Sequence, residues 1–94
     1  MSEKKQKRAV VSVIGKDQVG IIAKVTNVLA EDRVNVLDIS QTILQDFFTM
    51  IMIVDIAELE DLDVLTKKFK MIGQEMGLEI SIQLEEIFQA MHRV

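Results

Sequence analysis

Hydrophobic side chains follow two different periods along the chain, and each change of period marks a predicted element. Residues 8–14 form a short apolar run that is largely hydrophobic on both faces, as in an interior strand. Residues 47–56 are wholly apolar on one face and apolar at three of five positions on the other. Residues 34–44 and 78–84 alternate between apolar and polar side chains, as edge strands with one wet face do. The pattern therefore predicts two central strands and two edge strands.

Two longer segments carry their apolar side chains at helical spacing. The first, residues 19–32, has an apolar stripe of Ile22, Val25 and Leu29, flanked by Ile21 and Val28. The second, residues 60–76, gives the strongest periodic signal, with apolar residues alternately three and four positions apart: Leu62, Leu65, Phe69, Ile72 and Met76. Gly77 is well placed to end this second helix in a left-handed conformation, whereas the first helix has no glycine at its end.

The order of the elements, β-α-β-β-α-β, predicts the fold. Gln45 and Asp46 form the expected hairpin turn between the second and third strands. One antiparallel sheet in the order 4-1-3-2, with both helices on one face, satisfies the pattern with right-handed crossovers. The sequence thus predicts a ferredoxin-like α+β sandwich. Because Phe47, Ile51 and Ile53 would remain on the other face, we expect a homodimer that covers this face or extends the sheet.

The length of 94 residues corresponds to a single domain, residues 1–94. The polar and basic residues 1–7 are expected to form a mobile tail. Residues 85–94 are expected to form a short C-terminal helix, with Ile87, Phe88 and Met91 on one side. Three apolar side chains on a tail are expected to pack against another surface, because a soluble protein rarely leaves such a group exposed.

Composition limits the partners that the chain can have. The net charge of −4 argues against nucleic acid, because binding phosphates requires a basic face. The absence of Cys fits a cytoplasmic protein and excludes disulfides and Cys-ligated metals. No apolar run approaches the roughly 20 residues of a membrane-spanning helix. We therefore expect no nucleic-acid partner, no membrane partner and no cofactor.

Few side chains in the sequence can support catalysis. His92 is the only His, and no base lies near in sequence to the strand serines Ser12, Ser40 and Ser81. The acidic residues Glu58, Glu60, Asp61 and Asp63 precede or begin the second helix, where acidic side chains favour the helix dipole, and we expect no metal there. The sequence therefore predicts a protein without enzymatic activity.

The segment from Gly15 to Ile21 joins the first strand to the first helix and is the candidate ligand site. A helix start exposes N–H groups and the positive end of the helix dipole, which together attract an anion such as a carboxylate. Gly15 and Gly20 bracket the segment, so a ligand can approach the backbone; Gly20 could equally serve only to pack the helix start on the second strand. Asp17 is either the N-cap or the partner of a ligand ammonium. A zwitterion with its amine at Asp17 fits this segment better than a simple anion.

The same residues resemble the ACT domain, a β-α-β-β-α-β regulatory module that commonly binds amino acids. Three segments carry the resemblance most clearly: residues 13–22, 29–31 and 34–39. The match as a whole covers nearly the entire chain. Residues 38–42 and 87–93 look like a more specific group, the small stand-alone ACT proteins of unassigned function. The chain is also similar to the ACT domains of the glycine-cleavage regulator.

In members that bind amino acids, the resemblance implies a site at the dimer interface, built from the loop after the first strand and the start of the second. Carried over by position, the ligand-binding residues are Asp17, Gln18, Val19, Gly20, Ile21 and Asn35. Residues 18–21 would contribute their backbone. Asn35 would bind with its amide or would only fit the helix-to-strand turn, and Asp38 is expected to be a solvated edge residue.

Taken together, the residues and the resemblance predict a non-catalytic, homodimeric regulatory module that binds a small amino-acid-like ligand between its subunits. Through such a ligand it could act on a regulated protein. The alternative is a ligand-free interaction module that acts through its dimer surface or its apolar C-terminal tail.

Overall fold

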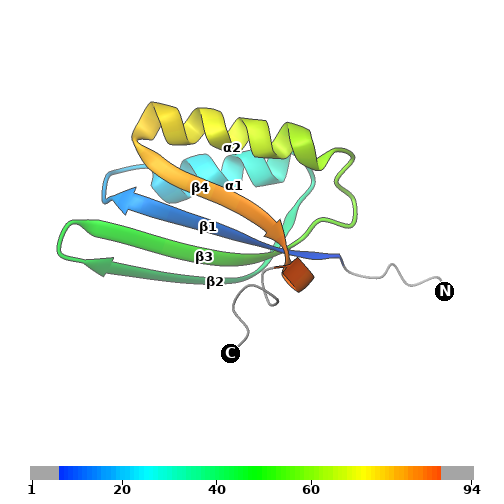
Figure 1. The fold of residues 1–94 in the computed structure, drawn as a ribbon, viewed down its shortest axis with the longest axis horizontal. Helices are drawn as coiled ribbons and strands as arrows, with labels where there is room; N and C mark the ends of the chain where they lie inside the picture. The colour runs from blue at the N-terminus through cyan, green and yellow to red at the C-terminus, as the bar shows by residue number, and fades with distance from the viewer. Residues whose placement is uncertain (1–6, 88–94) are drawn as a thin grey trace.

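The structure, a computed structural model, describes residues 7–87 (Figure 1). Its elements are β1 (Arg8–Lys16), α1 (Ile21–Glu31), β2 (Asn35–Leu44), β3 (Phe47–Asp55), α2 (Leu62–Met76) and β4 (Leu78–Leu84). Residues 85–87 are helical and follow β4 directly. Residues 1–6 of the predicted basic tail and residues 88–94 of the predicted C-terminal helix lie outside the described residues.

The four strands form one antiparallel sheet in the order β2-β3-β1-β4, which confirms the predicted ferredoxin-like topology. In the middle of the sheet, Val11 of β1 pairs with Met52 of β3 on one side and with Ile82 of β4 on the other. Both helices lie on the same side of the sheet (Figure 1), which we call the helix side. The opposite side is called the open face.

The hydrophobic core lies between the helix side of the sheet and the two helices. The two central strands bury every second residue there: Ala9, Val11 and Val13 from β1, and Phe48, Met50, Met52 and Val54 from β3. From α2, the core takes Leu65, Phe69 and Ile72, with Leu62 and Met76 packed at its margin, as the helical spacing predicted. Burying one such side chain contributes about 1.5–3 kcal/mol before ordering costs are subtracted.

The buried face of α1 differs from the prediction by one residue. Ile21, Val25 and Leu29 are buried, while Ile22 is exposed. Both Ile21 and Ile22 keep helical spacing with the other two, so the sequence pattern alone does not choose between them. The choice follows from the packing of α1 beside α2, to which Lys24 is tied by an ion pair with Glu75 at 3.8 Å. Ile22 is two residues from Lys24, which places it on roughly the opposite side of α1 from Lys24. Ile22 therefore points away from α2, toward the β2 edge of the sheet.

The first helix has no glycine at its end, and Arg33 adopts the left-handed conformation that a glycine usually takes there. Its φ is 61°, and Asp32 is the C-cap. The N–H of Val34 donates to the carbonyl of Leu29 at 2.9 Å, and the N–H of Arg33 donates to that of Ala30 at 3.2 Å. These two bonds form a Schellman motif, which satisfies the last carbonyls of the helix. Gly77 ends α2 with a φ of 69°, as predicted.

The edge strand β2 carries a bulge that the alternating pattern did not predict. Val36 pairs with Val54, but the next pair on the same side is Ile39 with Met52, so the register shifts between Val36 and Asp38. Beyond the bulge, Ile39 and Ile43 point to the helix side and are exposed, because neither helix covers this edge. The turn at residues 45–46 connects β2 to β3 at the predicted position.

Within residues 7–87, no helix has the length and hydrophobicity that a membrane crossing requires.

We expect Gly73→Ala to destabilise the domain, although Ala favours a helix interior over Gly by about 1 kcal/mol. A Cβ at Gly73 would lie 2.6 Å from the backbone carbonyl oxygen of Leu78, which the α2–β4 turn holds in place. Overpacking of this kind costs about 1–3 kcal/mol. Chemical denaturation would measure it. The neighbouring exposed Gln74→Ala is the control, and equal stability of both variants would contradict the prediction.

Candidate functional site

The loop between β1 and α1, residues 17–20, is held on two sides by hydrogen bonds. The backbone N–H of Asp17 donates to the carbonyl oxygen of Asp46 in the β2–β3 hairpin at 2.7 Å. The side-chain amide of Gln18 donates to the carbonyls of Met76 at 2.9 Å and Lys16 at 3.2 Å. The loop is therefore fixed to the hairpin and to the end of α2, which lie at the same end of the molecule (Figure 1).

Asp17 is not the N-cap of α1, which excludes one of the two roles expected for it. The cap is Gly20, which has a φ of 94° and is therefore in the left-handed region that favours glycine. Its carbonyl accepts the first helical hydrogen bond, from the N–H of Lys24, at 3.0 Å. The helix begins at Ile21, four residues after Asp17, which is too far for the Asp17 side chain to cap it. Among the described residues, the exposed Asp17 carboxylate has no hydrogen-bond or ion-pair partner.

The start of α1 is electrostatically open. No side chain of the described residues caps its N–H groups, and its first turn has no acidic residue. The side chain of Ile21 is buried in the core, so this residue presents only its backbone to the loop. Val19 stands beside it with 98% of its side chain exposed. Free amides and the positive end of the helix dipole thus lie a few residues from an unpaired carboxylate.

The two glycines of the loop have different roles. A Cβ at Gly15 would lie 2.5 Å from Cδ2 of Leu78, so Gly15 allows close packing within the protein rather than the approach of a ligand. This corrects the expectation that both glycines open the site. A Cβ at Gly20 would have no neighbour within 4 Å, so Gly20 does not pack against β2 and its surroundings are open.

Asn35, the remaining predicted site residue, lies at the other end of α1. It is exposed at the start of β2 and pairs with Asp55. The 11 residues of α1 separate it from the loop, a length of roughly 16 Å at 1.5 Å per residue. One chain therefore does not bring Asn35 and Asp17 together. Asp38, on the same strand, is exposed and accepts a hydrogen bond from the N–H of Ile39, as expected of a solvated edge residue.

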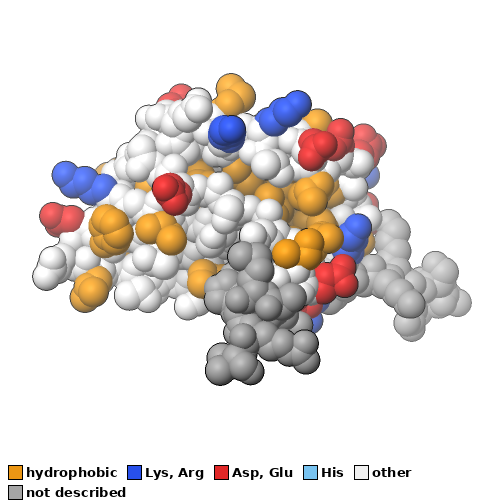
Figure 2. Space-filling model, in the orientation of Figure 1, with side chains coloured by type: hydrophobic (Ala, Val, Ile, Leu, Met, Phe, Trp, Pro, Cys, Tyr) orange, Lys and Arg blue, Asp and Glu red, His pale blue; other side chains and the backbone are white. Residues whose placement is uncertain are grey.

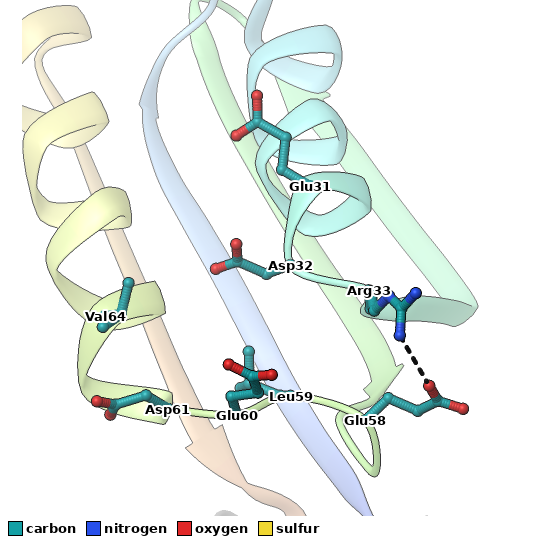
Figure 3. A pocket seen from close by; sticks show the side chains of 8 residues that line it. All are labelled: Glu31, Asp32, Arg33, Glu58, Leu59, Glu60, Asp61 and Val64. Atoms are coloured by element: carbon teal, nitrogen blue, oxygen red, sulfur yellow. Dashed lines mark ion pairs between the residues drawn. The ribbon is translucent and has the colours of Figure 1, made fainter.

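A cavity of about 320 Å³, which sequence reasoning missed, lies between the C-terminal end of α1 and the N-terminal end of α2 (Figure 3). Its lining is mostly acidic: Glu31, Asp32, Arg33, Glu58, Leu59, Glu60, Asp61 and Val64. Arg33 pairs with Glu58 at 3.9 Å, and Asp61 caps α2 by accepting a hydrogen bond from the N–H of Asp63. Among residues 7–87, no three acidic or imidazole side chains are arranged to hold a metal ion.

Lys68 supplies a cation to the acidic end of α1. Its Nζ donates to Oδ1 of Asp32 at 2.7 Å, which joins α2 to the end of α1. Oδ2 of Asp32 is buried and has no hydrogen-bond partner within residues 7–87. The hydrogen bond to Asp32 is the main cause that raises the pKa of the Lys68 ammonium above its usual value, and partial desolvation opposes it. The clustering of acidic residues in the sequence was a signal for this cavity, but only the fold brings its two parts together.

With this geometry established, comparison with known proteins assigns the family. A family model described as an ACT domain matches residues 7–83. The chain belongs to the ACT domain family. A UPF0237 protein of Methanocaldococcus jannaschii is 49% identical over 88 residues, which cover 93% of this chain and 98% of that protein. The resemblance inferred from the sequence is thereby confirmed.

Solved structures agree with the ACT assignment. An ACT domain protein from Streptococcus pneumoniae is 40% identical, covers 94% of this chain and all of that chain, and has a TM-score of 0.77. The regulatory subunit of aspartate kinase from Thermus thermophilus is 26% identical over 84% of this chain and 52% of that chain, with a TM-score of 0.65. A glycine cleavage system transcriptional repressor shares the fold, with 18% identity, a TM-score of 0.71 and coverage of 83% of this chain and 45% of that chain.

The Lys68–Asp32 bond makes the stability of this ACT domain depend on alkaline pH. Because the folded-state pKa of Lys68 is raised, its contribution is complete below the unfolded pKa of about 10.4 and is lost as pH rises through the folded pKa. Thermal unfolding of the wild type and Lys68→Met should therefore differ by a constant amount between neutral pH and mildly alkaline pH, and converge at higher pH. Lys70→Met, which removes an exposed lysine of the same helix, is the control. A difference that persists through strongly alkaline pH would contradict this assignment.

Proposed function

We propose that this ACT domain is a non-catalytic regulatory module that forms a homodimer and binds a small amino-acid-like ligand between its subunits. ACT domains are generally regulatory, ligand-binding modules. The observation that carries the proposal is the pairing, in one loop, of an unpartnered Asp17 carboxylate with the uncapped start of α1. An ammonium at Asp17 and a carboxylate at the helix amides match this pair of opposite charges.

The dimer is proposed to form by extension of the sheet through β2. An edge strand has a row of unpaired N–H and C=O groups, which another strand can pair with. The two edges differ, because Ile80, Ile82 and Leu84 of β4 are packed against the core, whereas Ile39 and Ile43 of β2 are exposed. Ile22 of α1 is also exposed, and on the side of the helix away from α2 it would extend this apolar surface. Pairing two β2 strands would bury the surface on both subunits.

This dimer would complete the ligand site. β1 and β2 both run antiparallel to β3, so they point in the same direction, and β2 ends at the hairpin beside the Asp17 loop. A two-fold axis pairs β2 with β2 of the partner in antiparallel orientation. The partner's Asn35 then comes to the end of the molecule at which this chain has its Asp17 loop. Its amide would contact a ligand that neither chain binds alone.

The side chains of the described residues support the absence of catalysis. Residues 7–87 contain neither His nor Cys. The hydroxyls of Ser12 and Ser81 are hydrogen-bonded to each other at 2.7 Å, so neither is paired with a base. Together with the acidic composition and the absence of Cys, this fits a cytoplasmic regulator that has no cofactor and acts on a partner protein rather than on nucleic acid or membrane.

Ligand binding is tested by a thermal-shift screen with the twenty amino acids at millimolar concentration. We expect at least one to raise the melting temperature, since a ligand at about 100 times its Kd stabilises the folded state by roughly 2.7 kcal/mol. Asp17→Asn should abolish the shift because the ammonium loses its counter-charge. Asp46→Asn removes an exposed carboxylate from the adjacent hairpin and should preserve the shift. If no amino acid shifts the wild type, the ligand proposal is wrong.

The dimer is tested by sedimentation equilibrium at tens of micromolar protein. The wild type should have twice the mass of one chain, and Ile39→Lys should be monomeric because it puts a charge into the paired β2 edges. Ile51→Lys is the matched control, since Ile51 of the open face is 38% exposed and Ile39 is 44% exposed. Dissociation by Ile51→Lys alone would show that the sheets pair through their open faces instead.

A further inference from the structure

The open face of the sheet is unevenly covered from one end to the other. Directly paired residues share a face, which assigns to this side Val10, Ser12 and Ile14 of β1 and Phe47, Thr49, Ile51 and Ile53 of β3. From the middle of β3 to the hairpin end, Ile51, Ile14 and Phe47 are exposed. Hydrophobic side chains reach the surface at the hairpin end (Figure 2). At the opposite end, Val10 is only 3% exposed.

The strands themselves do not explain the burial of Val10. It is absent from the cluster of core residues packed under the helices, in accordance with its position on the open face. Its neighbours across the sheet are Ile53 and Gln83, which flank it without lying above it. Ser12 and Ile14 have equivalent neighbours on the same strand and are progressively more exposed. The strand partners alone therefore do not account for the burial of Val10, and the cover is to be sought in the residues that follow β4.

The end of the described chain lies at this same place. Leu84, the last residue of β4, pairs with Ala9, and residues 85–87 begin a helical turn. Oε2 of Glu85 lies 3.4 Å from Nε of Arg8, which shares the open face with Val10 because side chains alternate along β1. The chain therefore leaves β4 beside the covered end of the open face.

We propose that residues 88–94 of the same chain dock on the open face over Val10 and Ile53. Seven residues span about 10 Å as a helix, which is enough to cross these two side chains from Ile87. Phe88 and Met91, three positions apart as on one face of a helix, are the apolar side chains available for the contact. Because the segment is tethered to the surface it covers, its effective concentration exceeds that of a second copy in solution.

This contact is independent of the proposed ligand and of the β2-edge dimer. It covers one end of the open face from within the chain, and it leaves the middle of that face at Ile51 and its hairpin end at Ile14 and Phe47 uncovered. It also gives the apolar C-terminal residues the packing surface that the sequence requires.

Thiol modification tests the proposal, because the chain has no native Cys. In the full chain, Val10→Cys should react slowly, as Val13→Cys in the core does. In a chain that ends after Ile87, Val10→Cys should react at least about tenfold faster and approach exposed Met71→Cys, while Val13→Cys remains slow and shows that the domain is folded. Equal protection of Val10→Cys in both chains would overturn the proposal.

A second variant covers the case in which truncation unfolds the domain. Phe88→Gln with Met91→Gln in the full-length chain should release Val10→Cys to the same extent. Protection should be independent of protein concentration, because the occupant belongs to the same chain. Protection that increases with concentration would assign the cover to a second copy and would also overturn the proposal.

Discussion

Burial of one side of the sheet beneath two helices is the constraint on which the rest of the structure depends. The alternate residues of β1 and β3 that face the helices are buried, and Val11, Met50 and Met52 among them are inaccessible to solvent. This face fixes the register of the central strands, because a slip of one residue would expose the entire set. The positions of both helices, and of the loops at their ends, follow from it.

The two ends of α1 have opposite electrostatic characters. At its start, the first turn has no acidic side chain and no side-chain cap among the described residues, and the unpaired Asp17 lies four residues before Ile21. At its end, Glu31 and Asp32 stand where acidic side chains are unfavourable to the dipole, and Lys68 from α2 offsets them. The first arrangement leaves charges available to a ligand. At the C-terminal end, most of the charges interact within the protein. Acidic side chains around the cavity there act as a helix cap or as ion-pair partners.

Two apolar surfaces remain outside the core, and each has a different physical origin. The β2 edge is exposed because the two helices are too few to cover four strands. The open face is apolar because central strands of β-branched and aromatic residues carry hydrophobic side chains on both sides. A sheet that is apolar on both sides requires a cover on its second side, and the end of the chain is proposed to supply it. The dimer contact is proposed to bury the other surface, the β2 edge.

The sequence by itself determined the identity and order of the elements, the strand order, the hairpin turn and the cap at Gly77. These depend on periodicity and local backbone preference, which adjacent residues express without distant contacts. Only the tertiary structure decided that Ile21 rather than Ile22 faces the core, that Gly20 rather than Asp17 caps α1, and that the β2 register shifts beside Leu37. It alone joined residues 31–33 to residues 58–64 around a cavity, and separated Asn35 from the loop with which it was expected to form a site. Each of these outcomes depends on packing between segments far apart in the chain, which local patterns do not encode.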